Sequence, residues 1–108
     1  MSEMHALDRL FATIAARKAG GDTDQSYTAK LLSQGVEKCA KKFGEEAVET
    51  VLASVSGDKQ HLAAESADVL YHLMVLWAAA GITPDDVYAA LKAREAQSGL
   101  AEKASRKS

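Results

Sequence analysis

The fold is decided by residues 36–80, whose sequence is VEKCAKKFGEEAVETVLASVSGDKQHLAAESADVLYHLMVLWAAA. Apolar residues recur at helical spacing in the first half and predict a helix over about 36–55. Gly57 suits the left-handed position that closes a helix, and Asp58 suits the cap of the next one. The second half is strongly apolar up to Gly81, as is typical of a buried helix. The segment therefore predicts two long consecutive helices. The apolar stripe predicted for the first consists of Val36, Ala40, Phe43, Ala47, Val51 and Val55.

The flanking segments predict three shorter helices. Apolar residues at three- and four-residue steps indicate a first helix from about Met4 to Lys18, followed by a polar, glycine-rich break at residues 20–24. Ser26 can cap a short helix that ends near Leu32. Thr83 can cap a last helix that begins at Pro84 and ends near residue 97. The residues expected to point inward from this last helix are Val87, Ala90 and Leu91. No segment alternates with the period of a strand, so the fold class is all-α with about five helices.

Composition limits the domain organisation and the partners. A chain of 108 residues with 47% hydrophobic and 26% charged residues is ordinary for one globular domain. We expect a single domain over residues 1–98 and a flexible tail over 99–108. The net charge of −2 gives no reason to expect nucleic acid, and the apolar run over 69–82 is too short for a membrane span of roughly 20 residues. The single cysteine, Cys39, and the lack of an apolar leader favour a cytoplasmic protein.

Two pairs of acids interrupt the apolar pattern of the long helices. Glu46 and Glu49 lie three residues apart on one helix, and Glu65 and Asp68 lie three apart on the other. This spacing places both side chains of each pair on one helix face. Four carboxylates brought together would repel each other and would be costly to desolvate without a cation. The pattern predicts a divalent-metal site between helices, and the alternative is a solvated acidic strip.

The acidic motifs resemble those of a known superfamily. The segments Glu45-Glu46-Ala47-Val48-Glu49 and Glu65-Ser66-Ala67-Asp68 resemble the Glu-Glu-x-x-Glu and Glu-x-x-Asp signature of the all-α nucleoside triphosphate pyrophosphatases, the MazG-like superfamily. Their surroundings, SYTAKLL at 26–32, Lys38, KFGEEAVE at 42–49 and ADVLYHL at 67–73, are similar to the phosphoribosyl-ATP pyrophosphatase family of histidine biosynthesis. The resemblance covers about residues 7–96.

The resemblance implies a reaction and a cofactor. Members of this family hydrolyse phosphoribosyl-ATP to phosphoribosyl-AMP and pyrophosphate, the second step of histidine biosynthesis. Superfamily members bind Mg²⁺ through acids that correspond here to Glu46, Glu49, Glu65 and Asp68. Mg²⁺ prefers hard oxygen ligands and is commonly held by a few carboxylates together with substrate phosphates. Either Glu45 or Glu49 could take the proton from the attacking water.

A triphosphate substrate also needs cationic and polar contacts. Lys38 and Lys42 lie four residues apart and can face the same way, and Lys30 lies in the preceding short helix, so all three are candidate phosphate ligands. Solvated lysines paired with nearby glutamates are the alternative. The remaining candidate substrate contacts are Ser26, Tyr27, Thr28 and His72. A capping role for the hydroxyls and a structural role for the histidine compete with that assignment.

Two other interpretations stay open from the residues alone. A related (d)NTP pyrophosphatase for house-cleaning would share the metal site, and a non-catalytic helical interaction module would use the cation structurally. A di-iron carboxylate bundle fails on spacing, because neither His61 nor His72 follows a glutamate by three residues. The superfamily is generally oligomeric, so we expect a homodimer, or a higher homo-oligomer, that completes an antiparallel bundle with four-helix character.

Overall fold

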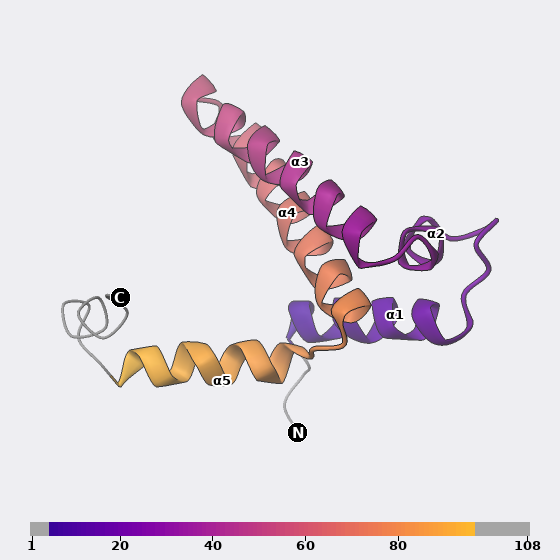
Figure 1. Cartoon of the computed structure of the whole chain (residues 1–108). Helices are drawn as coiled ribbons and strands as arrows, with labels where there is room; N and C mark the ends of the chain where they lie inside the picture. Colours follow the sequence, from indigo (N-terminus) through magenta and orange to yellow (C-terminus); the bar gives the residue numbers. More distant parts are fainter. Residues whose placement is uncertain (1–4, 97–108) are drawn as a thin grey trace.

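The computed structural model describes residues 5–96, and these residues form five helices and no strand (Figure 1). The helices are α1 (Ala6–Gly20), α2 (Tyr27–Ser33), α3 (Val36–Ser56), α4 (Lys59–Ala80) and α5 (Pro84–Glu95). The all-α prediction is therefore confirmed. The predicted start at Met4, the predicted end near residue 97 and the predicted tail over 99–108 lie outside the described residues.

Side-chain caps set the helix starts that the sequence predicted. Ser26 Oγ accepts a hydrogen bond from the backbone N–H of Ala29 at 3.1 Å, and Asp58 Oδ1 accepts one from that of His61 at 3.1 Å. Thr83 completes a capping box with Asp86 at the start of α5. Each cap satisfies a backbone donor that has no partner within its helix. Gly57 and Gly81 close α3 and α4 with φ of 83° and 86°, which favour glycine.

A hairpin of α3 and α4 forms the body of the molecule. The two helices run antiparallel side by side and share the most extensive contact between described elements (Figure 1). α1 packs against α4, and α2 lies against α1, α3 and α4. The buried core where these four helices meet consists of Ile14, Leu31, Cys39, Met74, Val75 and Ala78. Trp77 packs against this core, so Met74 and Trp77 are core residues as the sequence indicated.

The last helix departs from prediction. The break after Ala80 bends the chain by 111° between α4 and α5, and α5 makes little contact with the other helices. One link is Tyr88, whose hydroxyl donates to Asp8 Oδ1 of α1 at 3.1 Å. The inward placement of Ala90 and Leu91 is therefore wrong, since both are exposed. Taken singly, no described helix is long and apolar enough to cross a membrane, although the bent pair of α4 and α5 meets that test by length and composition.

The apolar stripe of α3 does not form the core of the chain. Cys39 and Ala53 are the buried residues of this helix, whereas Val51 is 61% and Val55 is 79% exposed. The prediction that this stripe forms part of the core is therefore wrong, because α4 packs against a neighbouring face of α3. We call the apolar set that points away from α4 the outward face of α3. It consists of Val48, Val51, Leu52 and Val55.

Candidate metal centre

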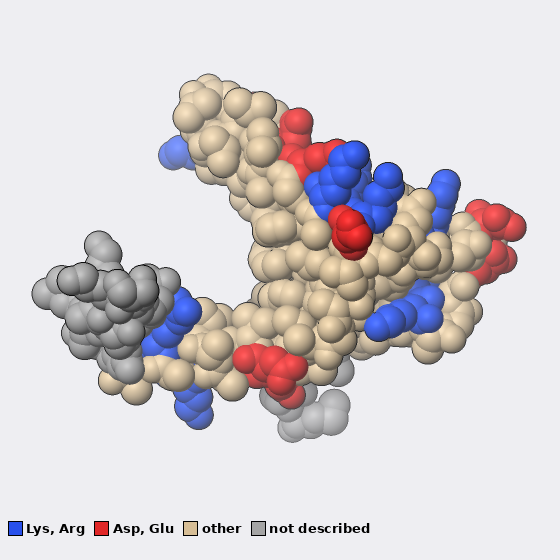
Figure 2. Space-filling view, in the orientation of Figure 1, with Lys and Arg blue, Asp and Glu red and all other residues tan. Residues whose placement is uncertain are grey.

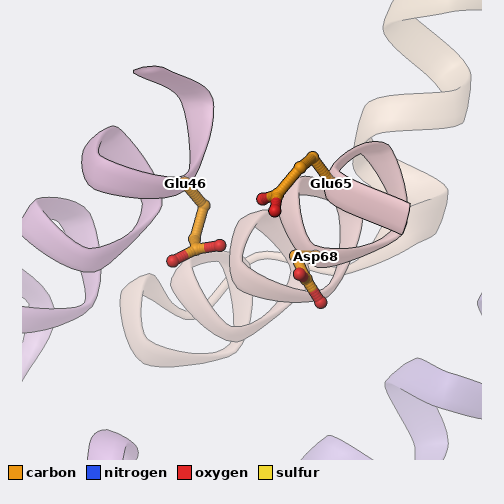
Figure 3. A group of neighbouring side chains, drawn as sticks. All are labelled: Glu46, Glu65 and Asp68. Carbon is orange, nitrogen blue, oxygen red and sulfur yellow. The ribbon is translucent and has the colours of Figure 1, made fainter. Parts of the chain in front are cut away.

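Three carboxylates meet between α3 and α4. One ligand oxygen from each of Glu46, Glu65 and Asp68 lies within 4.8 Å of the other two. Glu46 comes from α3, and Glu65 and Asp68 come from successive turns of α4 (Figure 3). Glu46 and Glu65 are half-buried and Asp68 is exposed, so the group opens to solvent at one side. The structure thus brings together one acid of the first predicted pair and both acids of the second.

The hairpin explains why these side chains meet. Antiparallel packing sets the middle of α3 against the first half of α4, and Glu46 lies on the α3 face that packs there. Glu65 and Asp68 are three residues apart and therefore share a face of α4. Glu65 also receives a contact from His61 Nε2, at 3.3 Å from Glu65 Oε2. The sequence analysis did not predict this contact, although residues four apart on a helix lie on the same face and the spacing of His61 and Glu65 could have indicated it.

The donor set suits a hard divalent cation. Three carboxylate oxygens within this separation repel one another unless positive charge lies between them. Oxygen ligands from carboxylates are those that Mg²⁺, Ca²⁺ and Mn²⁺ prefer, and no sulfur belongs to the group. The arrangement can therefore hold a divalent ion and present its open side to a phosphate.

The other two predicted acids lie beside this group. Glu49 is exposed and is not part of the three-carboxylate cluster, although it lies less than one turn from Glu46 on α3. Glu45 is exposed and lies 3.6 Å, Oε1 to Nζ, from Lys42. Both carboxylates are accessible to water, and neither is held by a buried contact.

Basic side chains gather on α3 just before the acids. Lys38, Lys41 and Lys42 line a surface hollow of about 160 Å³ together with Glu45. Figure 2 shows lysines and acids side by side over the first half of α3. The predicted facing of Lys38 and Lys42 is therefore seen, and Lys41 joins them. The structure brings cationic and anionic side chains to neighbouring positions on one helix.

Lys30 lies on a second hollow, formed by α2 and the loop before it. This hollow has a volume of about 520 Å³ and a mainly polar lining that includes Asp24, Ser26, Tyr27 and Lys30. Ser26 is engaged as the cap of α2, and Tyr27 is exposed. The hydroxyl of Thr28 shares a hydrogen bond with the hydroxyl of Tyr71 on α4. Structural roles thus account for Ser26 and Thr28, while Lys30 and Tyr27 are both exposed and line the hollow.

His72 lies between the core and the carboxylates. It is only 6% exposed, and its ring meets the rings of Tyr71 and Tyr27 edge-on, with centroids 4.9 Å and 6.2 Å away. Burial lowers its pKa below the ordinary value, while the nearby carboxylate of Glu46 opposes that shift. His72 is therefore a neutral, packed side chain near neutral pH.

Cys39 has no feature of a nucleophile. Its side chain is buried and donates to the carbonyl oxygen of Leu31 at 3.4 Å. Burial raises the pKa of its thiol, which keeps it protonated. The packing role expected from the sequence is what the structure shows.

The sequence matches one enzyme family over most of its length. The profile of the phosphoribosyl-ATP pyrophosphohydrolase family matches residues 7–95. The phosphoribosyl-ATP pyrophosphatase of Parvibaculum lavamentivorans is 63% identical over 100 residues, which cover 93% of this chain and 91% of that protein. The protein of the same name from Azospirillum brasilense is 61% identical over 102 residues, covering 94% and 91%. That from Cereibacter sphaeroides is 59% identical over 103 residues, covering 95% and 99%.

Proposed function

We propose that this chain, which belongs to the phosphoribosyl-ATP pyrophosphohydrolase family, hydrolyses phosphoribosyl-ATP to phosphoribosyl-AMP and pyrophosphate, the second step of histidine biosynthesis. The relatives that carry this activity in their names align over nearly the whole chain. The single structural observation that carries the proposal is the meeting of Glu46, Glu65 and Asp68 across the α3–α4 hairpin.

We assign Mg²⁺ as the cofactor. Glu46, Glu65 and Asp68 would hold it, with Glu49 as a fourth carboxylate from the exposed edge of α3. The chemistry that a bound Mg²⁺ supplies is neutralisation of the triphosphate and activation of water for attack. The chain's own contribution is to present several hard oxygens from two rigid helices that pack closely together.

The proton of the attacking water needs a base. The oxygen of that water bonds to the α-phosphorus, and the bond from this phosphorus to the bridging α,β oxygen breaks, so the electron pair leaves with pyrophosphate. Glu45 and Glu49 are the candidate acceptors of the proton, since both carboxylates are open to water: Glu45 lies beside the metal ligands, and Glu49 is an exposed member of the proposed ligand set. No covalent enzyme intermediate is required.

The lysines supply charge away from the metal. Lys38 and Lys42 line the same hollow as Glu45 and lie on the helix that carries Glu46, which suits them to bind the phosphates of the substrate. Lys30, on the hollow beside α2, is a candidate for a more distant phosphate. Tyr27 is exposed and lines this same hollow, which suits a contact with the base or ribose. Ser26, Thr28 and His72 are hydrogen-bonded or buried, and we assign them a supporting structural role.

We further propose that a second copy of the chain covers the outward face of α3. Full burial of one valine or leucine side chain contributes about 1.5–3 kcal/mol. Covering the four exposed apolar residues of this face would therefore contribute favourably to the free energy of association. A homodimer of four-helix character would bury this face. The free thiol of Cys39 is consistent with the cytoplasm, which we assign as its compartment.

One assay tests the proposed reaction. Purified protein is incubated with Mg²⁺ and either phosphoribosyl-ATP, ATP or dCTP, and pyrophosphate release is measured. We expect phosphoribosyl-ATP to be hydrolysed with a kcat/KM at least 100-fold above that of the simple nucleotides, a difference of about 2.7 kcal/mol in transition-state binding. Equal or faster hydrolysis of ATP or dCTP would indicate a house-cleaning pyrophosphatase instead. No release from any of the three would indicate a non-catalytic module.

A further inference from the structure

Thr50 links the two backbones that carry the facing carboxylates. It lies on α3, one turn after Glu46, and is half-buried against α4. Its Oγ1 atom is 3.0 Å from the carbonyl oxygen of Glu46 and 3.1 Å from the carbonyl oxygen of Glu65. The hydroxyl therefore spans the interface between α3 and α4 at the level of Glu46 and Glu65.

The chemistry of threonine fits this position. A carbonyl oxygen in a helix has a second lone pair available beyond its backbone hydrogen bond, so both carbonyls can accept from the same hydroxyl, whose single proton is shared or alternates between them. Because the side chain is branched at Cβ, a bond to the carbonyl four residues earlier favours one rotamer. That rotamer also directs Oγ1 across the interface to Glu65.

Nearby hydroxyls on the hairpin do not make this link. Ser54 on α3 donates to the carbonyl of Val51 at 2.6 Å, and Ser66 on α4 donates to that of Leu62 at 2.7 Å. Both bonds stay within one helix. The bridging bond of Thr50 is therefore a feature of its location beside the acids and does not follow from having a hydroxyl on the hairpin.

We propose that Thr50 is a positioning residue, which sets the register and separation of α3 and α4 so that the carboxylates of Glu46 and Glu65 meet at the distance a divalent ion requires. This inference rests on the proposed metal site. Outer contacts that orient metal ligands typically change metal affinity by about 10–100-fold when they are removed. Thr50 would act on the ligands through their backbones, without touching the metal or the substrate.

The test compares metal affinity with stability in the full-length chain. Thr50→Val keeps the shape and removes the hydroxyl, Thr50→Ser keeps the hydroxyl, and Ser66→Ala removes a half-buried hydroxyl that bonds within α4. The probe is Mn²⁺ alone, which accepts the same oxygen ligands and can be counted by its paramagnetic resonance. The second readout is the thermal midpoint of each metal-free protein.

We expect Thr50→Val to bind Mn²⁺ about 10-fold more weakly than the wild type, and Thr50→Ser and Ser66→Ala to bind within about twofold of it. If Thr50→Val binds within twofold while its metal-free midpoint falls, Thr50 serves stability alone and the inference is overturned. If Ser66→Ala weakens binding as much as Thr50→Val, the cross-helix link is not the cause and the inference is again overturned. If the wild type itself binds no Mn²⁺, the proposed metal site fails first, and the role of Thr50 fails with it.

Discussion

Each of two faces of α3 departs from the usual pattern of an amphipathic helix. The face that packs against α4 carries Glu46 and Thr50, whereas the opposite face carries Val51 and Val55 into solvent. Stepping about 100° per residue places Val55 roughly 180° around the helix from Glu46. A carboxylate on a packed face and valines on an open one are both unfavourable in the isolated chain. The proposed cation would offset the first cost, and the proposed second copy would offset the second.

The largest effect is expected from the inward face. Glu46→Gln keeps the size of the side chain but removes a full negative charge from the three-carboxylate cluster. The loss of a ligand should lower kcat/KM for phosphoribosyl-ATP by at least about 100-fold at a fixed Mg²⁺ concentration, because the metal supplies several kcal/mol of charge stabilisation. Steady-state pyrophosphate release measures it.

The matched control for this change is Glu37→Gln. Glu37 is an exposed acid in the first turn of the same helix, outside the cluster. Its substitution should leave kcat/KM within about threefold of the wild type, since exposed charges contribute little. Equal losses in the two variants would contradict a specific role of the inward face.

The next effect concerns the outward face. Val51→Asp places a charge in the centre of the exposed apolar set. We expect the wild type to sediment as a dimer and this variant as a monomer in sedimentation velocity, because a buried, unpaired carboxylate opposes association strongly. The folded helical content should persist in circular dichroism, since Val51 is exposed within one chain.

Val36→Asp is the control for the outward face. Val36 is also exposed, but it begins α3, where a negative charge is favourable. This variant should sediment with the wild-type mass. A monomeric wild type, or a dimeric Val51→Asp variant, would show that the outward face is not covered by a second copy.

The smallest expected effect is on the pH dependence of stability, through His72, which is buried near Glu46. Burial lowers the pKa of His72, so the unfolded chain binds a proton on it at a higher pH than the folded chain does. Stability from this residue is thus fully present above about pH 6.5 and is lost as the pH falls through the lower folded pKa. As the pH is lowered from roughly 7.5 to roughly 5.5, which crosses the ordinary pKa of histidine, the thermal midpoint of the metal-free wild type should fall more than that of His72→Phe.

His61→Gln is the comparison for the histidine. His61 is exposed and near the start of α4, so its change should leave most of the wild-type pH dependence in place. A wild-type midpoint that does not fall over this pH range, or that falls equally in His72→Phe, would contradict a neutral buried His72.

Local chemistry made most of the fold predictable. The caps at Ser26, Asp58 and Thr83, and the glycines that close α3 and α4, are read from neighbouring residues, and the structure places the helix ends within two residues of the prediction where they are described. The orientation of α5 was not predictable in this way. Its apolar residues imply a buried face, but the 111° bend after α4 leaves Leu91 exposed, and periodicity carries no information on what a helix packs against.

The sequence indicated candidate residues for the site but not how they are arranged in space. The three-residue spacing of Glu65 and Asp68 placed both on one face of α4, and the structure joins Glu46 to them. Helical spacing alone did not separate Glu46 from Glu49, because both lie near the same face of α3. The link from Thr50 to Glu65, 15 residues later in the sequence, depends on how α3 and α4 pack together, which no local pattern encodes.

Anomalous diffraction from crystals of the full-length protein soaked in Mn²⁺ tests most directly whether the inward face of α3 binds a divalent metal. We expect an anomalous peak within bonding distance of carboxylate oxygens from Glu46, Glu65 and Asp68, at about 2–2.3 Å, on the inward face of α3. A well-occupied peak elsewhere on the chain with none between these three carboxylates would contradict it.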